Sequence, residues 1–474
     1  MNGGTMTYRK RITYKYCILF TIISRLHGFR SALFARLFLI TLAFVPALFF
    51  CGCTDVNSSI PGSSSDDLVI FVQDHERLDL VQKVAGDYTN ASGGRVIINT
   101  ISPDWDGDSA DLFGDILITD MAHIPAMADQ GHIVSLNSLL GSNSSVNWTV
   151  FESPTLSLVG EYPDYSGKMY ALPFYLDALG IVYRGDLFDD PDVSDAFCLT
   201  YGYPMAVPGS YRELSDLAGF FSQNGFNLSG IAFAGLTGPD PLSSPWLSLV
   251  SSYGSHIIHP VSGTSSGSWN SSNTVSALLM LRNLSNLSPD GAFSWGDTHV
   301  ADAFSSGKIA MGITWFSRFD SIESDSKLHN ISARFIPLVG EVTDSGSYRG
   351  ITVKIDGIAM IEGGNQDNAI SFLTWFYSPD VQMSYAKSGI QPSLIPVLDS
   401  FSYLSLNGYN RAFPESMRVG VTAEKGQDTP AVRFICEESV QEILSMDDCS
   451  EEKIQDILDA SVARIDLLTR GASA

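Results

Sequence analysis

An alternation of apolar strand segments and helical segments, starting at residue 68, constrains the fold of this chain more than any other feature. Residues 68–72 (LVIFV) form a short apolar run of the strand type, and the charged segment 78–89 has a helical pattern. Further strand segments follow at 95–101 and 115–118. Strand, helix and strand at this spacing are typical of a parallel sheet with helical crossovers. The sequence therefore predicts an α/β fold.

The rest of the chain continues this mixture of helices and strands. Further strands are predicted at 177–184, 308–313, 333–339 and 358–361, and further helices at 124–129, 210–222, 272–287, 367–377, 432–445 and 451–468. The helix after Ser210 opens on a capping box, in which Glu213 stands three residues after the serine. Gly/Ser-rich loops are expected at 237–245 and 261–273. A chain of 474 residues is long enough for two lobes, each with its own core.

The first 52 residues are predicted to be a signal peptide. A positively charged region ends at Arg36, and the apolar run 37–50 is too short to span a bilayer comfortably. The small Gly52 before Cys53 resembles the lipobox of bacterial lipoproteins, which predicts a lipidated Cys53 carrying a diacylglyceryl group and an acyl chain such as palmitate. Residues 53–66 would be the lipidated cysteine and a flexible tether. The alternatives are cleavage at an ordinary site and an uncleaved anchor.

The charge of the chain excludes one class of partner. The formal net charge is −24, and removal of the leader with its seven basic residues would take it to −31. Such a surface repels phosphate backbones, so we expect no nucleic-acid binding. Contact with the membrane is expected through the lipid anchor only.

Few cysteines follow the leader, which excludes a disulfide-rich scaffold and a four-cysteine zinc site. Cys436 and Cys449 could form a disulfide in an oxidising compartment, and the sequence does not decide this. Cys198 is then expected to be a small buried hydrophobe.

Three segments match catalytic or metal-binding motifs in sequence but lack the structural context that those motifs need. Residues 263–267 match a nucleophile elbow but lie in a Ser/Gly loop, without the required strand before and helix after. The acidic turn 104–108 lacks the glycine that a calcium loop has at its sixth position. His256 and His259 have no third ligand nearby. We therefore expect no catalytic residue, no metal and no cofactor.

Several phrases, in order along the chain, resemble the extracellular solute-binding proteins of sugar importers, the maltose-binding-like family 1. The phrases are DILI at 115–118 with ADQGHIVSL at 128–136, GKMYALP at 167–173 running on to DALGIVYRGDLF at 177–188, YREL at 211–214 with Tyr211 where the family usually has tryptophan, AFSSGKIAM at 303–311, AISFLTW at 369–375 and GIQP at 389–392. They cover nearly all of the chain after the tether.

The resemblance implies a two-lobed periplasmic-binding-protein fold of type II, with a ligand cleft between the lobes and a hinge of crossing strands. The chain would cross at about residues 177, 330 and 389. Lobe I would then hold residues 67–177 and 331–389, and lobe II residues 178–330 and 390–474.

Sugar recognition requires hydrogen-bonding groups for the hydroxyls and aromatic rings for the apolar face. In open α/β sheets such groups lie at the carboxyl ends of strands. Asp177 is the first candidate because the family places a polar residue there facing the cleft; the alternative is a residue that caps a hinge turn. Tyr175 is expected on the same wall. Asp74 and His75 follow the first strand, and Asp120 follows the third; all three are candidates for ligand contact. The alternative for them is that they are ordinary polar residues of surface loops.

The other ligand-binding candidates are aromatic residues and arginines at positions matched to the family's cleft. Trp315 and Arg318 follow the strand 308–313, Trp246 follows the loop 237–245, and Tyr348 and Arg349 lie in a later loop.

Together these observations predict a lipid-anchored, monomeric, non-enzymatic receptor at the periplasmic or extracellular face of the cell membrane. It would bind a mono- or oligosaccharide and deliver it to the permease subunits of an ABC importer. The alternatives are an extracytoplasmic carbohydrate-active enzyme, with Asp177 and Asp120 as the carboxylate pair to measure, and a surface or sensor lipoprotein that has lost transport.

Overall fold

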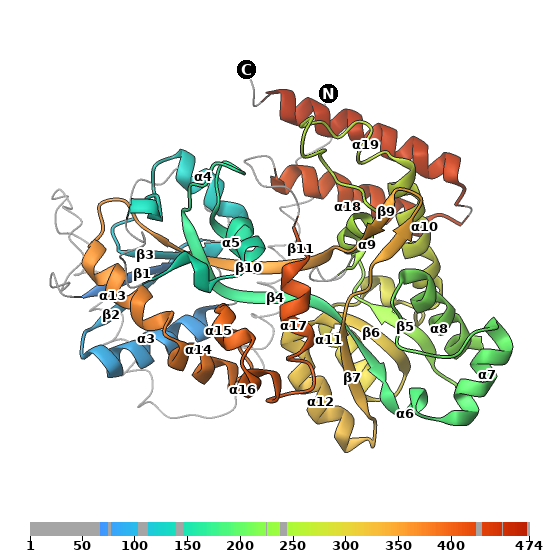
Figure 1. Cartoon of the computed structure of the whole chain (residues 1–474). Coiled ribbons are helices and arrows are strands. Elements are labelled where there is room, and N and C mark those ends of the chain that lie inside the picture. The colour runs from blue at the N-terminus through green and yellow to red at the C-terminus, as the bar shows by residue number, and fades with distance from the viewer. Residues whose placement is uncertain are drawn as a thin grey trace, which may run out of the picture. The chain divides into compact units, whose positions relative to one another are not determined.

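One long strand, β4 (Ala171–Arg184), joins the two halves of a nine-stranded sheet. The computed structural model describes residues 67–73, 77–102, 112–138, 146–223, 225–237, 244–422, 429–447 and 449–471. The order of the sheet is β2-β1-β3-β10-β4-β6-β5, with β11 beside β10 and β7 beside β4. Figure 1 shows β4 and β10 running between the two groups of strands.

The bounds of the elements are as follows. The strands are β1 (Leu68–Val72), β2 (Val96–Thr100), β3 (Ile116–Asp120), β4 (Ala171–Arg184), β5 (Ser229–Phe233), β6 (Ile309–Trp315), β7 (Ala333–Pro337), β8 (Glu341–Thr343), β9 (Gly346–Tyr348), β10 (Ile351–Met360) and β11 (Gly420–Val421). The α-helices are α3 (Leu78–Ser92), α4 (Ile124–Asp129), α5 (Ser153–Gly160), α6 (Gly185–Phe188), α7 (Pro191–Tyr201), α8 (Tyr211–Gln223), α9 (Trp246–Ser252), α10 (Ser272–Asn286), α11 (Asp297–Ser305), α12 (Phe319–Leu328), α13 (Gln366–Phe376), α14 (Pro379–Ala386), α15 (Ile395–Leu398), α16 (Phe401–Leu404), α17 (Ala412–Arg418), α18 (Thr429–Ser445) and α19 (Glu451–Gly471).

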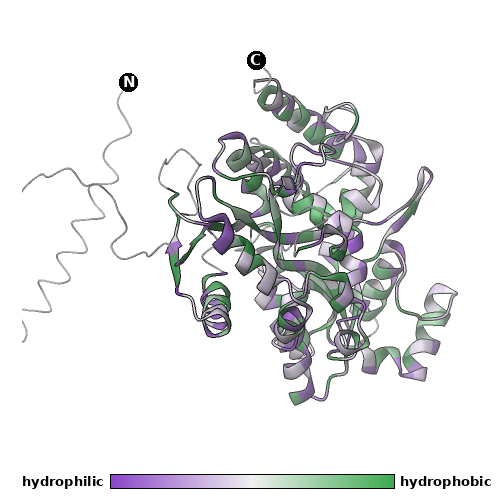
Figure 2. Cartoon of the chain, turned by 60° about the vertical axis from the view of Figure 1, so that its left-hand side comes forward, coloured by the Kyte–Doolittle hydropathy of each residue, from purple (hydrophilic) through white to green (hydrophobic). Residues whose placement is uncertain are grey.

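The first half of the sheet consists of β2, β1 and β3, which are parallel as the alternation of strands and helices predicts. β10 extends it antiparallel to β3, and the first part of β4 pairs antiparallel with β10. The strands carry the apolar core: Ile70, Val72 and Leu117 are fully buried. Figure 2 shows hydrophobic residues along the strands and mixed hydropathy on the covering helices. Burial of these apolar side chains is the main force that holds this half together.

The second half of the sheet consists of β6, β5 and β7. The last part of β4 pairs antiparallel with β6 and β7, and β5 lies parallel to β6. α8 packs against β5, and α11 packs against β6. The capping box at the start of α8 forms in a shifted version. The backbone N–H of Glu213 donates to Ser210 Oγ at 3.2 Å, and Glu213 Oε2 accepts from the backbone N–H of Gly209 at 2.7 Å.

The course of the chain between the halves can be followed from its pairings. β7 pairs with the last part of β4, and the chain returns to the first half along β10. Further along, the ring of Tyr409 packs against Phe319 and Phe335 of the second half, and α17 contacts both β4 and α5. The lobe boundaries at about residues 177, 330 and 389 remain predictions.

The Ser/Gly-rich loop 261–273 is a docking surface for the last helix, α19. Trp269 Nε1 donates to Ser461 Oγ at 2.9 Å, and Ser265 Oγ donates to Asp466 Oδ1 at 2.7 Å. Ser265 is therefore a structural residue of a loop, in agreement with the rejection of a nucleophile elbow.

No disulfide joins Cys436 and Cys449 among the described residues. The prediction of a buried Cys198 is wrong, because its side chain lies on the exposed face of α7. Among the helices of the described residues, none combines the length and the apolar character that a membrane crossing needs.

Candidate functional site

Asp177 lies at the point where β4 changes its neighbours. The residues up to Ala178 pair with β10, and the residues from Leu179 onward pair with β6. A side chain at this point belongs to the strand that joins the two halves. The sequence placed the first ligand-binding candidate at this junction.

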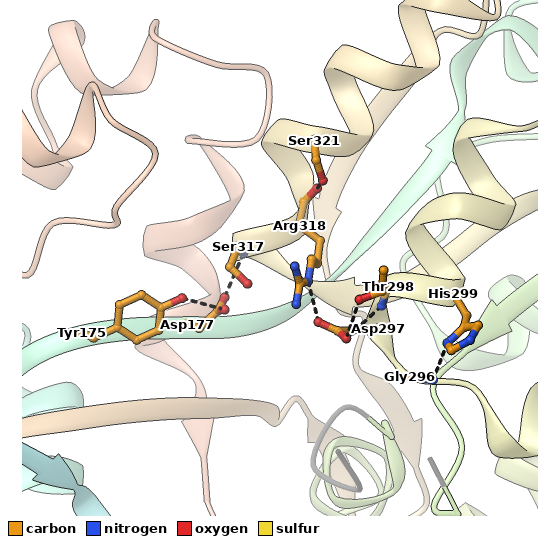
Figure 3. Close-up of polar contacts among 9 residues, drawn as sticks. All are labelled: Tyr175, Asp177, Gly296, Asp297, Thr298, His299, Ser317, Arg318 and Ser321. Atoms are coloured by element: carbon orange, nitrogen blue, oxygen red, sulfur yellow. Dashed lines mark hydrogen bonds and ion pairs between the residues drawn. The ribbon is translucent and has the colours of Figure 1, made fainter. Parts of the chain in front are cut away.

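The carboxylate of Asp177 is 3% exposed and bonded on both oxygens. Oδ1 accepts from the backbone N–H groups of Ala178 at 2.9 Å and Ser317 at 3.2 Å. Oδ2 accepts from the Tyr175 hydroxyl at 3.3 Å (Figure 3). Burial raises the pKa of Asp177, while the hydrogen bonds from Ser317 and Ala178 and the charge of Arg77 oppose that rise. Asp177 thus ties the junction to Ser317, which follows β6.

Tyr175 is held from the opposite side by Arg77, at the start of α3. The guanidinium carbon of Arg77 lies 3.9 Å from the centre of the tyrosine ring, a cation–π contact. Arg77 Nε also donates to Asp356 Oδ2 on β10 at 2.8 Å. Asp356 is fully buried and stands opposite Tyr175 in the strand register. Burial is the largest cause of the raised pKa of Tyr175, so its hydroxyl is a hydrogen-bond donor at neutral pH.

Arg318 and Asp297 form a second ion pair on the side of the second half. Arg318 Nε lies 2.5 Å from Asp297 Oδ2, and Figure 3 shows the guanidinium directed at this carboxylate, beside Ser317. Asp297 opens α11. Close by in the chain, the ring of Trp295 stacks on His299, with centroids 6.2 Å apart. The backbone oxygen of Trp295 accepts from the N–H of Gly235, just after β5. These groups therefore gather at the carboxyl ends of β5 and β6, as the rule for open α/β sheets predicts.

Asp120, at the end of β3, caps the short helix that follows. Its Oδ1 accepts from the backbone N–H of Ala122 at 2.8 Å. In the strand register Asp120 stands opposite Asp356, which itself stands opposite Tyr175. The structure thus places Asp120, Asp356 and Tyr175 side by side on the neighbouring strands β3, β10 and β4, with Asp177 two residues further along β4.

Three of the predicted site residues lie outside the described part of the chain: Asp74, His75 and Cys53. The signal peptide and the tether, residues 1–66, lie outside it as well.

The predicted aromatic residues do not gather at this edge as exposed rings. Trp246, on α9, is 1% exposed and packs edge-to-face against Trp269. Trp315 ends β6 opposite Leu179 and is 3% exposed. Both are core residues here, because a tryptophan at the end of an apolar strand or helix buries its large surface unless a polar neighbour prevents it.

Tyr348 and Arg349 lie at a different place. They line a groove of about 350 Å³ beside the β8–β9 hairpin. Arg349 Nη1 pairs with Glu415 at 2.6 Å, and its Nε donates to the backbone oxygen of Leu338. The structure gives neither residue a contact with Asp177.

Four residues of the site were not predicted: Arg77, Asp356, Asp297 and Trp295. Arg77 and Asp356 are 279 positions apart, so no local pattern joins them. A usable signal existed for Asp297, which stands at the first position of a predictable helix near the end of a strand.

Three further grooves, lined by described residues, lie away from Asp177. One of about 610 Å³ runs between α18 and α19, and one of about 560 Å³ lies at the amino ends of β1 and β3. A third, of about 440 Å³, lies between α5 and α9. We base the site on the polar cluster at the carboxyl ends of the strands, because open α/β sheets bind their ligands at that edge.

Comparison with solved structures supports the fold assignment. The chain is similar to the cyclic alpha-maltosyl-1,6-maltose binding protein of Arthrobacter globiformis, at 17% identity and a TM-score of 0.65, covering 84% of this chain and 97% of that one. It is also similar to an ABC transporter solute-binding protein of Agrobacterium radiobacter in complex with ribitol, at 18% identity and a TM-score of 0.65, covering 85% and 98%. A third relative, of Agrobacterium vitis with bound D-mannitol, has 16% identity and a TM-score of 0.63, covering 86% and 99%. The fold is thus the two-lobed α/β fold of maltose-binding-like proteins.

Comparison with curated proteins finds no match. The model of the family described as "Bacterial extracellular solute-binding protein" matches residues 106–383, more than half of the chain. This chain therefore belongs to the bacterial extracellular solute-binding protein family.

Proposed function

We propose that this protein is an extracytoplasmic receptor that binds a sugar or a polyol at the Asp177 edge of the sheet and delivers it to an ABC importer. The observation that carries the proposal is the position of Asp177 at the junction of β4, with polar groups from both halves around it. Family membership supports the receptor role, and solved relatives crystallised with ribitol and D-mannitol support the ligand class.

The chemistry of the edge fits a neutral ligand with many hydroxyl groups. Asp177, Asp120 and Asp297 supply carboxylate oxygens, which accept hydrogen bonds from hydroxyls. Trp295 is half-buried and supplies a ring for the apolar face of a sugar. Arg77 and Arg318 each pair with one carboxylate, so the cluster has no excess of positive charge that would favour a phosphate.

In this proposal the two halves of the sheet correspond to the two lobes, and the ligand binds between them. The chain acts as a receptor and catalyses no reaction. The partners are the permease subunits of the importer, and the receptor works as a monomer at the periplasmic or extracellular face of the membrane. Binding would favour closure of the two lobes because a ligand that contacts both stabilises the closed arrangement.

Isothermal titration calorimetry with monosaccharides, oligosaccharides and sugar alcohols tests the ligand class. We expect saturable binding of at least one of these compounds by the chain that starts after the tether. Absence of heat and of thermal stabilisation across the whole panel would refute the sugar and polyol class.

Lipid anchoring at Cys53 is a separate part of the proposal, supported by the lipobox-like Gly52-Cys53 pair and the polar tether. Membrane fractionation of Cys53→Ser should move the protein to the soluble fraction. A variant that stays with the membrane would show that the uncleaved leader is the anchor.

A further inference from the structure

Arg77, which is partly buried, joins three segments that are far apart in the sequence. It lies at the start of α3, its Nε is 2.8 Å from Asp356 on β10, and its guanidinium covers the ring of Tyr175 on β4. The side chain of Arg77 is 14% exposed and that of Asp356 is fully buried. This pairing anchors the guanidinium at its Nε atom, beside the ring of Tyr175.

The contacts continue from Tyr175 to the second half of the sheet. The Tyr175 hydroxyl donates to Asp177 Oδ2, and Asp177 Oδ1 accepts from the backbone N–H of Ser317. The network Asp356–Arg77–Tyr175–Asp177–Ser317 is therefore continuous from α3 to the end of β6. The link between Tyr175 and Asp177, at 3.3 Å, is its longest hydrogen bond.

We infer that Arg77 is a positioning residue of the ligand-binding site: it presses on the ring of Tyr175 and so sets the Tyr175 hydroxyl against Asp177. The inference rests on the proposed function, because it says which residue positions the contacts of Asp177, the central carboxylate of the proposed site. Arg77 acts through Tyr175 and is distinct from the groups that meet the ligand. A planar guanidinium can stack on a ring while one edge pairs with a carboxylate, whereas a lysine ammonium cannot do both in the same way.

A double-mutant cycle between Arg77→Lys and Tyr175→Phe tests the inference with the chain that starts after the tether. Arg77→Lys keeps the charge beside Asp356, and Tyr175→Phe keeps the ring and removes only the hydroxyl. We expect each single variant to raise the Kd for the best sugar of the panel about tenfold. The double variant should raise it no further, because both changes remove the same hydrogen bond.

Two results would overturn the inference. Multiplying effects in the double variant would mean that Arg77 contacts the ligand itself. A wild-type Kd in Arg77→Lys would mean that only the charge of Arg77 matters. Arg334→Lys is the matched control, since Arg334 forms an ion pair with Asp189 on the surface and should leave the Kd unchanged.

A measurement without ligand separates this inference from the proposed function. The groups near Asp177 are Tyr175 on β4, Arg77 from α3, Ser317 after β6, and Lys354, its partner in the register of β10; Arg318, which follows Ser317, pairs with Asp297. In a chain with 13C-labelled aspartate side chains, the carboxyl resonance of Asp177 is assigned with Asp177→Asn. Its titration midpoint should rise in Tyr175→Phe and by the same amount in Arg77→Lys. In both variants the Asp177 carboxylate loses the hydrogen bond from the Tyr175 hydroxyl.

The two readouts give distinguishable failures. An unchanged midpoint in Arg77→Lys would overturn the positioning role even if sugars bind. A raised midpoint in a protein that binds no sugar would keep the network and refute the proposed ligand class.

Discussion

Two ion pairs flank Asp177, and they differ in burial. Arg77 and Asp356, on the side of the first half, have side chains that are 14% and 0% exposed. Arg318 and Asp297, on the side of the second half, are 44% and 15% exposed. Both pairs join an arginine and an aspartate at close distance. Only the exposed one can exchange its partner for water or ligand at low cost, because a buried charge without its partner carries a large desolvation penalty.

The difference suggests two roles for the two sides of the site. The buried pair fixes Tyr175 and belongs to the permanent architecture of the first half. The exposed pair lies next to Ser317, whose backbone N–H meets Asp177, and can rearrange when a ligand arrives. In the proposed site, a rigid wall would lose little conformational entropy on binding, and an adjustable wall would adapt to the ligand.

The largest expected effect is on stability, at the buried pair. Arg77→Met leaves the Asp356 carboxylate buried without its cation, and we expect the free energy of unfolding to fall by about 3–5 kcal/mol. Urea denaturation measures it. The double variant Arg77→Met/Asp356→Leu should recover much of the loss, because it removes both charges. A single variant as stable as the wild type would show that the pair is not structural.

The next effect concerns ligand affinity at the adjustable wall. If Trp295 stacks on the sugar, Trp295→Ala should raise the Kd about five- to tenfold, since an aromatic contact contributes about 1 kcal/mol beyond its buried area. Trp295→Phe keeps a ring and should stay within about twofold of the wild type. Equal affinity of all three proteins would remove Trp295 from the site.

A pH effect follows from the buried carboxylate of Asp177. Burial raises its pKa in the folded state, so the unfolded state ionises first as the pH increases. Stability is therefore unaffected by this group below the unfolded-state pKa, and it falls as the pH rises toward the folded-state pKa. Asp177→Asn removes the penalty, and the variant should gain stability relative to the wild type at pH 7 and lose that advantage near pH 4. A pH-independent difference in thermal unfolding would contradict this.

The smallest expected effect is at the exposed pair. Arg318→Met or Asp297→Asn should change the free energy of unfolding by no more than about 1 kcal/mol, because solvent screens the pair. High salt should reduce the difference further. A loss as large as that of Arg77→Met would show that the two pairs are equivalent and would end the distinction between the walls.

Much of the fold could be predicted from local patterns. The strand 68–72 and the helix 124–129 occur at their predicted bounds, since an apolar run and a proline near the first turn of a helix are local signals. β4 is longer than predicted because residues 171–176 are apolar on both faces of a central strand, and such a run has no period-2 signal. The return along β10 depends on pairing between distant strands, which a local pattern does not contain.

Of the proposed site, only the centre could be predicted from the sequence, and this part remains a prediction. The prediction of Asp177 comes from its place in a phrase that resembles the family, GKMYALP and its continuation. Arg77 and Asp356 come together only in the tertiary structure. Trp246 follows a loop, as a ligand-binding tryptophan could, but it lies in the core. Burial decides between these cases, and it depends on packing partners that the sequence does not name.

The affinity of Asp177→Asn for the best sugar of the panel tests the central claim most directly. The substitution keeps the shape of the side chain and removes the charge that accepts hydrogen bonds from hydroxyls. Loss of a charge-assisted hydrogen bond of about 1.5–3 kcal/mol predicts a Kd about 10- to 100-fold higher than that of the wild type. The matched control, Asp189→Asn on the surface, should bind like the wild type. An unchanged Kd in a folded Asp177→Asn protein would contradict the account and place the ligand elsewhere.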